Sequence, residues 1–230
     1  FLIVVLVLIG SCAGNKQEKI GYDHDAPGRV EILFLGHDSE HHNSEKFAPM
    51  LAMPLFQKGI NLTYTSNPED LTPENLDKYD GLMIYANHNE ISPEHEEAIK
   101  NYIEGGKGLI PIHSASFMFR NSDWYVDAVG AQFKSHGAGD FTALITKPDH
   151  PVMKGLSEFE TWDETYVHSK INPDMTVLME RVEDGYNEPW TWVREQGEGR
   201  VFYTAYGHDE RTWQHPGCHE LVANGVLWAV

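Results

Sequence analysis

The sequence predicts a three-layer α/β/α domain with a mostly parallel central sheet, and three observations support this prediction. Short apolar segments alternate with helical ones through the first half of the chain, and each apolar segment runs into a polar loop. The length of 230 residues and the 41% hydrophobic composition suffice for one buried core. Strand–loop–helix units at this spacing require right-handed crossovers, which place helices on both faces of the sheet.

The N-terminal half supplies the parallel strands. They are expected at Val30–Leu35, Ile60–Thr65, Gly81–Ala86 and Leu109–Ile112. The first helix is expected to be capped by Ser44 and disturbed by Pro54. Ser92 as N-cap and Pro93 at the first helical position mark the start of a later helix. Because the carboxyl ends of parallel strands share one edge, the polar loops that follow them are expected to meet there.

The C-terminal half is expected to add antiparallel strands. A polar loop over Ser135–Asp140 separates the strand-like Phe133 from a strand at Phe141–Thr146. Further strands are expected at Met175–Val182, Pro189–Arg194 and Arg200–Tyr206. The glycines of Glu195–Gly199 predict that the last two form a hairpin. A closing apolar helix is expected over His219–Val230.

The first 29 residues are expected to lie outside this domain. Phe1–Ile9 is an uncharged apolar run too short to cross a bilayer, and small residues and Cys12 follow it, as in a secretory signal. Residues 9–12, Ile-Gly-Ser-Cys, resemble a bacterial lipobox. We expect a lipoprotein signal over 1–12 with Cys12 lipidated, a flexible tether over 13–29 and the domain over 30–230. This predicts a protein anchored at the bacterial cell envelope.

Composition excludes several classes of partner. The formal net charge is −18, with 35 acidic and 17 basic residues, so the protein repels nucleic acid and anionic membranes. Membrane contact is therefore expected only through a lipid on Cys12. The two cysteines, Cys12 and Cys218, form neither a disulfide framework nor a CxxC metal site. The sequence is also compatible with a homo-oligomer.

The chain has thirteen histidines, and two of them end apolar strands at the shared edge. His113 and His208 are placed where an imidazole can exchange protons with a substrate near neutral pH. Glu164 lies in the segment Trp-Asp-Glu-Thr-Tyr, where a carboxylate accompanies aromatic rings. We predict that His113, His208 and Glu164 are the catalytic acid and base groups.

Aromatic rings beside carboxylates are a common way to bind sugars, because the ring covers C–H faces while the acid accepts hydroxyl hydrogens. The residues predicted to bind a carbohydrate substrate are His37, Asn43, His136, Asp140, Asp163, Tyr166, Trp190 and Trp213. Trp190 and Trp192 alternate on a strand, so one of them is expected in the core, as is Trp228.

Two alternatives use the same edge. Converging imidazoles could hold a divalent metal such as zinc, and the candidates are His37, His41, His42, His113, His136 and His208. His41 and His42 are adjacent on an extended segment, so at least one is expected to face solvent. A serine hydrolase centred on Ser114 lacks the flanking glycines of a GxSxG turn. The remaining histidines, His95, His150, His168, His215 and His219, are expected to be structural or exposed.

Short motifs occur in a fixed order through Val30–Val230. They are HHN, IHSASF, HGAGDF, HPVMKGL, WDETY, GRVFYTAYGHDERTW and HELVANGVLWA. This set resembles the ThuA-like (trehalose-utilisation) family, which implies a flavodoxin-like fold of the class I glutamine-amidotransferase type. Residues 112–115 look like the nucleophile elbow of that fold, and residues 206–210 look like its His-acid segment. No cysteine stands at the elbow, so we expect no glutamine hydrolysis.

The resemblance also implies a role in the catabolism of disaccharides or keto-sugars. We therefore expect a ThuA-like lipoprotein that acts on carbohydrate by proton transfer next to a carbonyl, as a keto-sugar isomerase, lyase or hydrolase would. A divalent-metal-dependent hydrolase is one alternative. A non-enzymatic sugar-binding or interaction module is another, because this scaffold hosts unrelated functions.

Overall fold

Ten strands and six α-helices make up the described part of the chain, which in this computed structural model comprises residues 28–183 and 185–230. The strands are β1 Val30–Leu35, β2 Ile60–Thr65, β3 Gly81–Ile84, β4 Gly108–Pro111, β5 Gln132–Thr142, β6 Leu144–Ile145, β7 Glu160–Ser169, β8 Thr176–Glu183, β9 Tyr186–Gln196 and β10 Gly199–Thr204. The helices are α1 Ser44–Gln57, α2 Pro73–Leu76, α3 Pro93–Glu104, α4 Asp123–Val129, α5 Glu210–Trp213 and α6 Pro216–Ala229. Short 3₁₀ turns occupy Pro68–Asp70, His113–Phe117 and Pro151–Met153.

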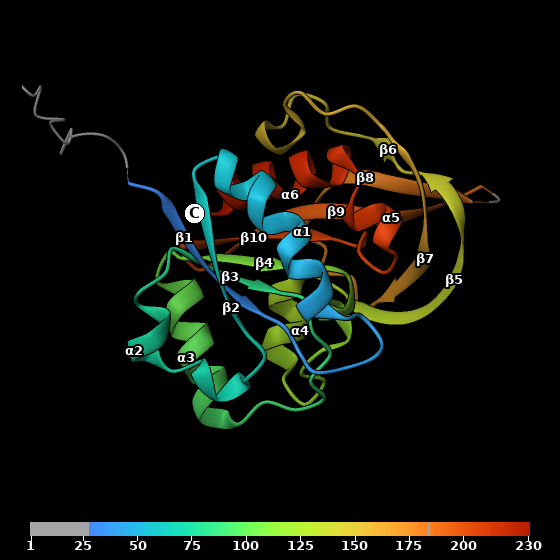
Figure 1. Cartoon of the computed structure of the whole chain (residues 1–230). Coiled ribbons are helices and arrows are strands. Elements are labelled where there is room, and N and C mark those ends of the chain that lie inside the picture. Colours follow the sequence, from blue (N-terminus) through green and yellow to red (C-terminus); the bar gives the residue numbers. More distant parts are fainter. Residues whose placement is uncertain (1–27, 184) are drawn as a thin grey trace, which may run out of the picture.

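Eight of the strands form one sheet in the order β2-β1-β3-β4-β10-β9-β8-β6. The first five are mutually parallel, and β9, β8 and β6 continue the sheet with antiparallel pairing. Helices α1 and α6 cover one face, and α3 and α4 lie on the other (Figure 1). The predicted three-layer, flavodoxin-like α/β/α fold with antiparallel additions near the C-terminus is therefore confirmed.

The central parallel strands are buried on both faces, which explains their continuous apolar composition, whereas the edge strand β2 is partly exposed. Every residue of β3 and β4 is buried, as are the last four residues of β1. Strands covered on both sides read as unbroken apolar runs, so their polar groups are confined to the loops at the sheet edge. The predicted bounds of the first two strands, Val30–Leu35 and Ile60–Thr65, are confirmed.

Helix α1 departs from the prediction at both ends. Its N-cap is Asn43, whose side chain accepts the N–H of Lys46 at 2.9 Å, and Ser44 is the first helical residue. Pro54 lies inside the helix, which continues to Gln57. Leu55 is buried, so packing of the last turn against the core outweighs the hydrogen bond that proline removes.

The prediction of a polar loop over Ser135–Asp140 is wrong. These residues belong to β5, which pairs antiparallel with β7 from Gln132 opposite Ser169 to Thr142 opposite Glu160. The pair is a separate two-stranded sheet that curves along the side of the domain (Figure 1). Pairing with a distant strand satisfies the backbone of this glycine-containing segment, while its polar side chains stay in solvent. The strand predicted at Phe141–Thr146 is accordingly broken at Ala143.

The signal, lipobox and Cys12 predictions lie outside the described residues. Arg29, at the end of the predicted tether, bonds to Asn61 at 2.7 Å and to the Phe56 carbonyl at 2.6 Å. Within the described residues, no helix combines the length and the apolar character needed to cross a bilayer.

Close packing of α6 on β10 generates a stability prediction. A Cβ atom at Gly225 would lie 2.4 Å from Cδ1 of Phe202, a buried ring of β10. We expect Gly225→Val to lower the free energy of unfolding by about 2 kcal/mol through overpacking. Urea denaturation measures the change, and Leu227→Ala on the exposed side of α6 is the control. Equal or greater stability of Gly225→Val would contradict this packing.

Candidate functional site

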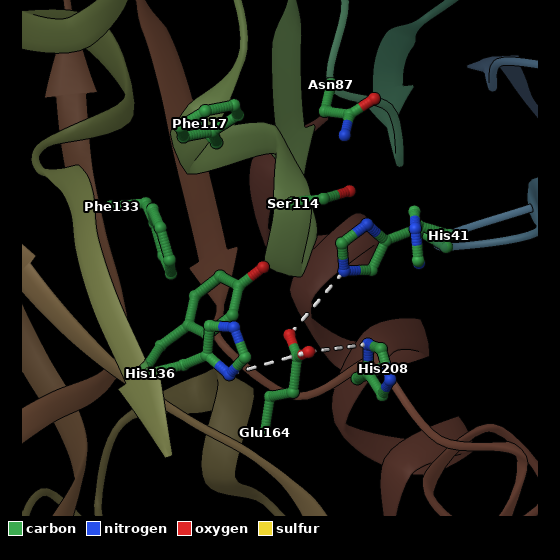
Figure 2. A pocket seen from close by; sticks show the side chains of 10 residues that line it. His41, Asn87, Ser114, Phe117, Phe133, His136, Glu164 and His208 are labelled. Carbon is green, nitrogen blue, oxygen red and sulfur yellow. Dashed lines mark ion pairs between the residues drawn. The ribbon is translucent and has the colours of Figure 1, made fainter. Parts of the chain in front are cut away.

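Four loops or strands deliver side chains to one point at the carboxyl edge of the sheet. The loop after β1 carries His42, the turn after β4 carries His113, β7 carries Glu164, and the loop after β10 carries His208. Figure 2 shows His208 and His136 of β5 pointing toward the Glu164 carboxylate. In the sheet, β2 lies on one side of β1 and β3 lies on the other, so the strand order reverses direction at β1. Open α/β sheets bind ligands at the carboxyl edge beside such a reversal.

Glu164 is the centre of the cluster. Its Oε2 atom lies 3.3 Å from Nε2 of His113 and 3.6 Å from Nε2 of His42. Its Oε1 atom lies 3.2 Å from Nδ1 of His208 and 3.5 Å from Nδ1 of His136. The structure therefore brings together the three residues that were predicted as catalytic groups, and it adds His42.

The backbone at His113 is strained and its ring is fully buried. His113 has φ of 47° in the left-handed region, which costs a non-glycine residue about 1–3 kcal/mol. It follows a central strand and opens a 3₁₀ turn, as the residue at a nucleophile elbow does. The side chain is 0% exposed, and burial lowers its pKa to about 3, so the imidazole is neutral.

The hydrogen of this neutral ring belongs on Nδ1. Nδ1 lies 2.7 Å from the carbonyl oxygen of Ala205, and a carbonyl can only accept. Nε2 of His113 therefore presents a lone pair to Glu164 rather than a hydrogen. Burial raises the pKa of Glu164, but the surrounding imidazoles lower it more, so the net shift is downward and the carboxylate is an anion. An electron pair thus faces a carboxylate across 3.3 Å.

The donor set suits a divalent metal ion. Ligand atoms of His42, His113, Glu164 and His208 all lie within 4.8 Å of one another. Nε2 of His113, Nδ1 of His208 and both ring nitrogens of His42 are buried without a hydrogen-bond partner. Imidazoles with a carboxylate are typical ligands of zinc and similar ions. The Nδ1–H bond from His113 to a carbonyl is the outer bond that metal-bound histidines make.

Asp163 orders the loop that carries His208. The carboxylate is buried and accepts backbone N–H groups from Gly207 and His208 at 2.8 Å each and from Asp209 at 3.2 Å. Burial raises its pKa to about 7, although these N–H groups favour the anion. Asp163 was predicted to contact substrate, and the structure corrects this, because its oxygens are used by the loop.

A buried polar network supports the His113 turn from behind. The Tyr203 hydroxyl donates to the carbonyl of His113 at 3.1 Å and lies 3.2 Å from Nε2 of His168. The opposite nitrogen of His168 lies 2.9 Å from the carboxylate of Glu188, which also accepts the His168 backbone N–H at 2.8 Å. His168 was expected to be structural or exposed, and it is a buried member of this network.

A cavity of about 400 Å³ opens beside the Glu164 cluster. Phe117, Phe133 and Tyr166 form an aromatic side, with the Phe133 ring centroid 5.5 Å from that of Phe117 and 4.5 Å from that of Tyr166. Asn87 and Ser114 lie across from Phe117 and Phe133 (Figure 2). The cavity is also lined by His41, His42, His136, Glu164 and His208. Among the predicted substrate-binding residues, His136 and Tyr166 thus reach it.

Two tryptophans were predicted to contact a sugar, and the structure places both in the core. Trp190 is 0% exposed, and Trp213 is 1% exposed with its Nε1–H donating to the Gly207 carbonyl at 2.6 Å. Trp192 is buried as well, so both members of the alternating pair are interior. Trp192 packs on Tyr203 and Trp190 on Tyr206, with ring centroids 4.0 and 5.5 Å apart, and a local alternation pattern does not reveal such contacts. Trp228, expected in the core, is partly buried and packs against it.

Three further predicted substrate contacts lie away from the cavity. Asn43 caps α1, and Asp140 is exposed on β5 without lining the cavity. His37 is buried and bonds through Nε2 to the carbonyl of His42 at 2.8 Å, so it supports the loop that carries His42. His41 is exposed and His42 is half-buried, in agreement with the expectation that one of the pair faces solvent.

Sequence reasoning missed three cavity residues, Asn87, Phe117 and Phe133. The position of Asn87 directly after an apolar strand was a usable signal. The two phenylalanines carry none, because an aromatic residue beside a strand is as common in a core as in a cavity.

Comparisons with known proteins agree with this fold. The family model ThuA, described as trehalose utilisation, matches residues 31–229. A solved ThuA-like protein from Bacteroides uniformis ATCC 8492 superposes with a TM-score of 0.74 at 21% identity, covering 90% of this chain and 95% of that one. A ThuA-like protein from Parabacteroides merdae ATCC 43184 gives 0.73 at 16% identity over 87% and 90% of the two chains. No curated protein matches the chain.

A larger enzyme contains a similar fold. The β-galactosidase from Bacillus circulans sp. alkalophilus gives a TM-score of 0.59 at 14% identity, with 90% of this chain matching 31% of that one. At such identities the solved structures show a shared fold.

The buried network behind His113 generates a prediction. We expect Glu188→Ala to lower the free energy of unfolding by about 3 kcal/mol, because the ring and the backbone N–H of His168 both lose their acceptor. Glu183→Ala is a matched control, since Glu183 pairs with Arg181 but is 63% exposed and should cost about 1 kcal/mol or less. Urea unfolding curves compare the two, and equal losses would contradict a structural role for the network.

Proposed function

Because this chain belongs to the ThuA (trehalose utilisation) family, we propose that it is an enzyme that acts on a carbohydrate with the help of a divalent metal ion. The proposed ligands are His42, His113, Glu164 and His208. One observation carries the proposal: Nε2 of His113 presents a lone pair to the Glu164 carboxylate, and a cation between them converts repulsion into attraction.

The chemistry proposed for this site is that of keto-sugars. A divalent ion held by these four residues would supply a Lewis acid that polarises a carbonyl or activates water, which suits isomerisation, elimination or hydrolysis. His136 is 44% exposed at 3.5 Å from Glu164, so it can carry protons between the site and solvent. Phe117 and Phe133 are partly exposed and line the cavity, so they offer aromatic surface on which the C–H face of a sugar can lie.

Two other functions use the same cavity. In metal-free acid–base catalysis, His113 and His208 would move protons themselves, and the neutral state of buried His113 suits a base. In a sugar-binding module, the aromatic side of the cavity would hold ligand without turnover. Metal content and product formation separate these possibilities from the proposal.

We also propose, from the lipobox-like residues before Cys12, that the protein is lipid-anchored at the cell envelope. A lipid label incorporated by the complete protein in a bacterial host, and lost in Cys12→Ser, would support this location.

The first prediction of the proposal concerns metal. We expect the purified protein to hold about one divalent ion per chain, as measured by mass spectrometry. His113→Ala and Glu164→Ala should each lower metal affinity by at least about tenfold. Turnover of a keto-disaccharide prepared from trehalose, followed by NMR in D₂O, should stop after chelation and resume when metal is restored.

The control for this experiment is His41→Ala. His41 is the neighbour of His42 and lines the same cavity, but it is outside the four-residue cluster, so its loss should leave metal content unchanged. Full turnover by metal-free protein would contradict the proposed metal site and favour proton transfer by the histidines. Saturable sugar binding without any product would favour the binding module.

The second prediction concerns Asp163, which does not face the cavity. In Asp163→Asn the new NH₂ group would face the N–H donors of Gly207 and His208, so the loop that carries His208 should move. We expect metal affinity to fall by about 10- to 100-fold, as is usual for outer-shell changes. Competition titration with a zinc indicator measures it. An unchanged affinity in a folded variant would contradict the positioning role.

A further inference from the structure

A second cavity shares Asn87 with the cavity beside Glu164. Its volume is about 580 Å³, and loops that follow β1, β2 and β3 line it. Asp38 comes from the first loop, Ser66 and Glu69 from the second, and His88 and Glu90 from the third. Asn87 lines both cavities, so the two spaces are neighbours. We refer to this second space as the polar groove.

The charge of the groove defines what it can bind. Asp38, Glu69 and Glu90 are exposed carboxylates in its walls. Among the described residues that line either cavity, none is a lysine or an arginine, and the other titratable groups of the groove are the imidazoles of His37, His88 and His95. Carboxylates accept hydroxyl hydrogens but repel anions, so this lining disfavours phosphorylated sugars and sugar acids. An uncharged, hydroxyl-rich group fits it.

The junction between the two spaces offers hydrogen bonds that the protein itself leaves unused. Ser114 is fully buried, lines the first cavity, and its hydroxyl has no partner. Asn87 and Ser114 lie on the same side of the cavity, across from the aromatic rings (Figure 2). A buried hydroxyl without a partner costs stability, which a ligand oxygen at this point would restore.

We propose that the polar groove holds the second unit of an uncharged glycoside whose first unit lies in the aromatic cavity beside Glu164. The glycosidic bond between the two units lies beside Asn87 and Ser114. This inference rests on the proposed function, since it presumes that the aromatic cavity takes a sugar. It adds the place of the second sugar unit, the lack of charge of the ligand and the residues that select for both.

The test compares two-unit and one-unit ligands on the metal-loaded protein. The probes are trehalose, maltose, cellobiose and lactose, with the methyl glucosides and methyl β-galactoside as one-unit ligands and trehalose 6-phosphate as the anion. Calorimetry should show at least one disaccharide binding about tenfold or more tightly than its methyl monosaccharide, the effect of about two net hydrogen bonds. Trehalose 6-phosphate should bind more weakly than trehalose.

Variants in the groove complete the test. Ser66→Trp fills the groove from an exposed position, and it should remove the preference for the disaccharide while leaving methyl glycoside binding unchanged. Glu69→Ala keeps the groove open but removes an acceptor, so it should weaken disaccharide binding alone by a few-fold. Ser157→Trp is the matched control, because Ser157 is exposed and lines neither cavity.

The outcomes separate this inference from the proposed function. If disaccharides bind no more tightly than methyl glycosides, or if Ser66→Trp changes nothing, the groove is not a sugar subsite, although the aromatic cavity still binds sugar. If trehalose 6-phosphate binds best, the charge argument is wrong. If no sugar binds the metal-loaded protein, the proposed function fails and the inference fails with it.

Discussion

The contact between His113 and Glu164 determines what the functional edge of this protein can do. The Ala205 carbonyl holds the hydrogen of His113 on Nδ1, so an electron pair on Nε2 faces a carboxylate at 3.3 Å. The imidazole cannot turn away, because its ring is fully buried and stacks on Tyr166 with centroids 4.0 Å apart. Two electron-rich atoms held this close repel each other until a cation or a proton lies between them. The proposed metal site follows from this constraint.

Buried carboxylates that never face the cavity hold this contact in place. Asp163 and Glu164 are neighbours on β7, so their side chains point to opposite sides of the strand. Asp163 binds the backbone of the loop that carries His208, while Glu164 faces the cavity. On the other side, Glu188 orients His168 behind the His113 turn. Much of the site's geometry therefore depends on residues that no ligand would touch.

The turn after β4 shows how one backbone geometry can serve different chemistry. In the amidotransferase-like fold that this chain resembles, a residue at this elbow is lifted out of the sheet to act as a nucleophile. Here the same strained position holds His113, whose ring nitrogen can bind a metal or accept a proton but does not form an acyl intermediate through sulfur. The fold places a side chain at the mouth of the sheet, and the identity of that side chain sets the reaction.

The sequence by itself determined the α/β/α architecture and the edge of the sheet at which the candidate site lies. Apolar runs such as Val30–Leu35 and the Ser92-Pro93 cap specify strands and helices through local periodicity and hydrogen bonding, and the order of the parallel strands places His113 and His208 at a common end. The tertiary structure alone decided which side chains reach the cavity. Trp190 is interior and Ser135–Asp140 is a strand, because burial and pairing depend on strands far away in the sequence, which no local pattern records.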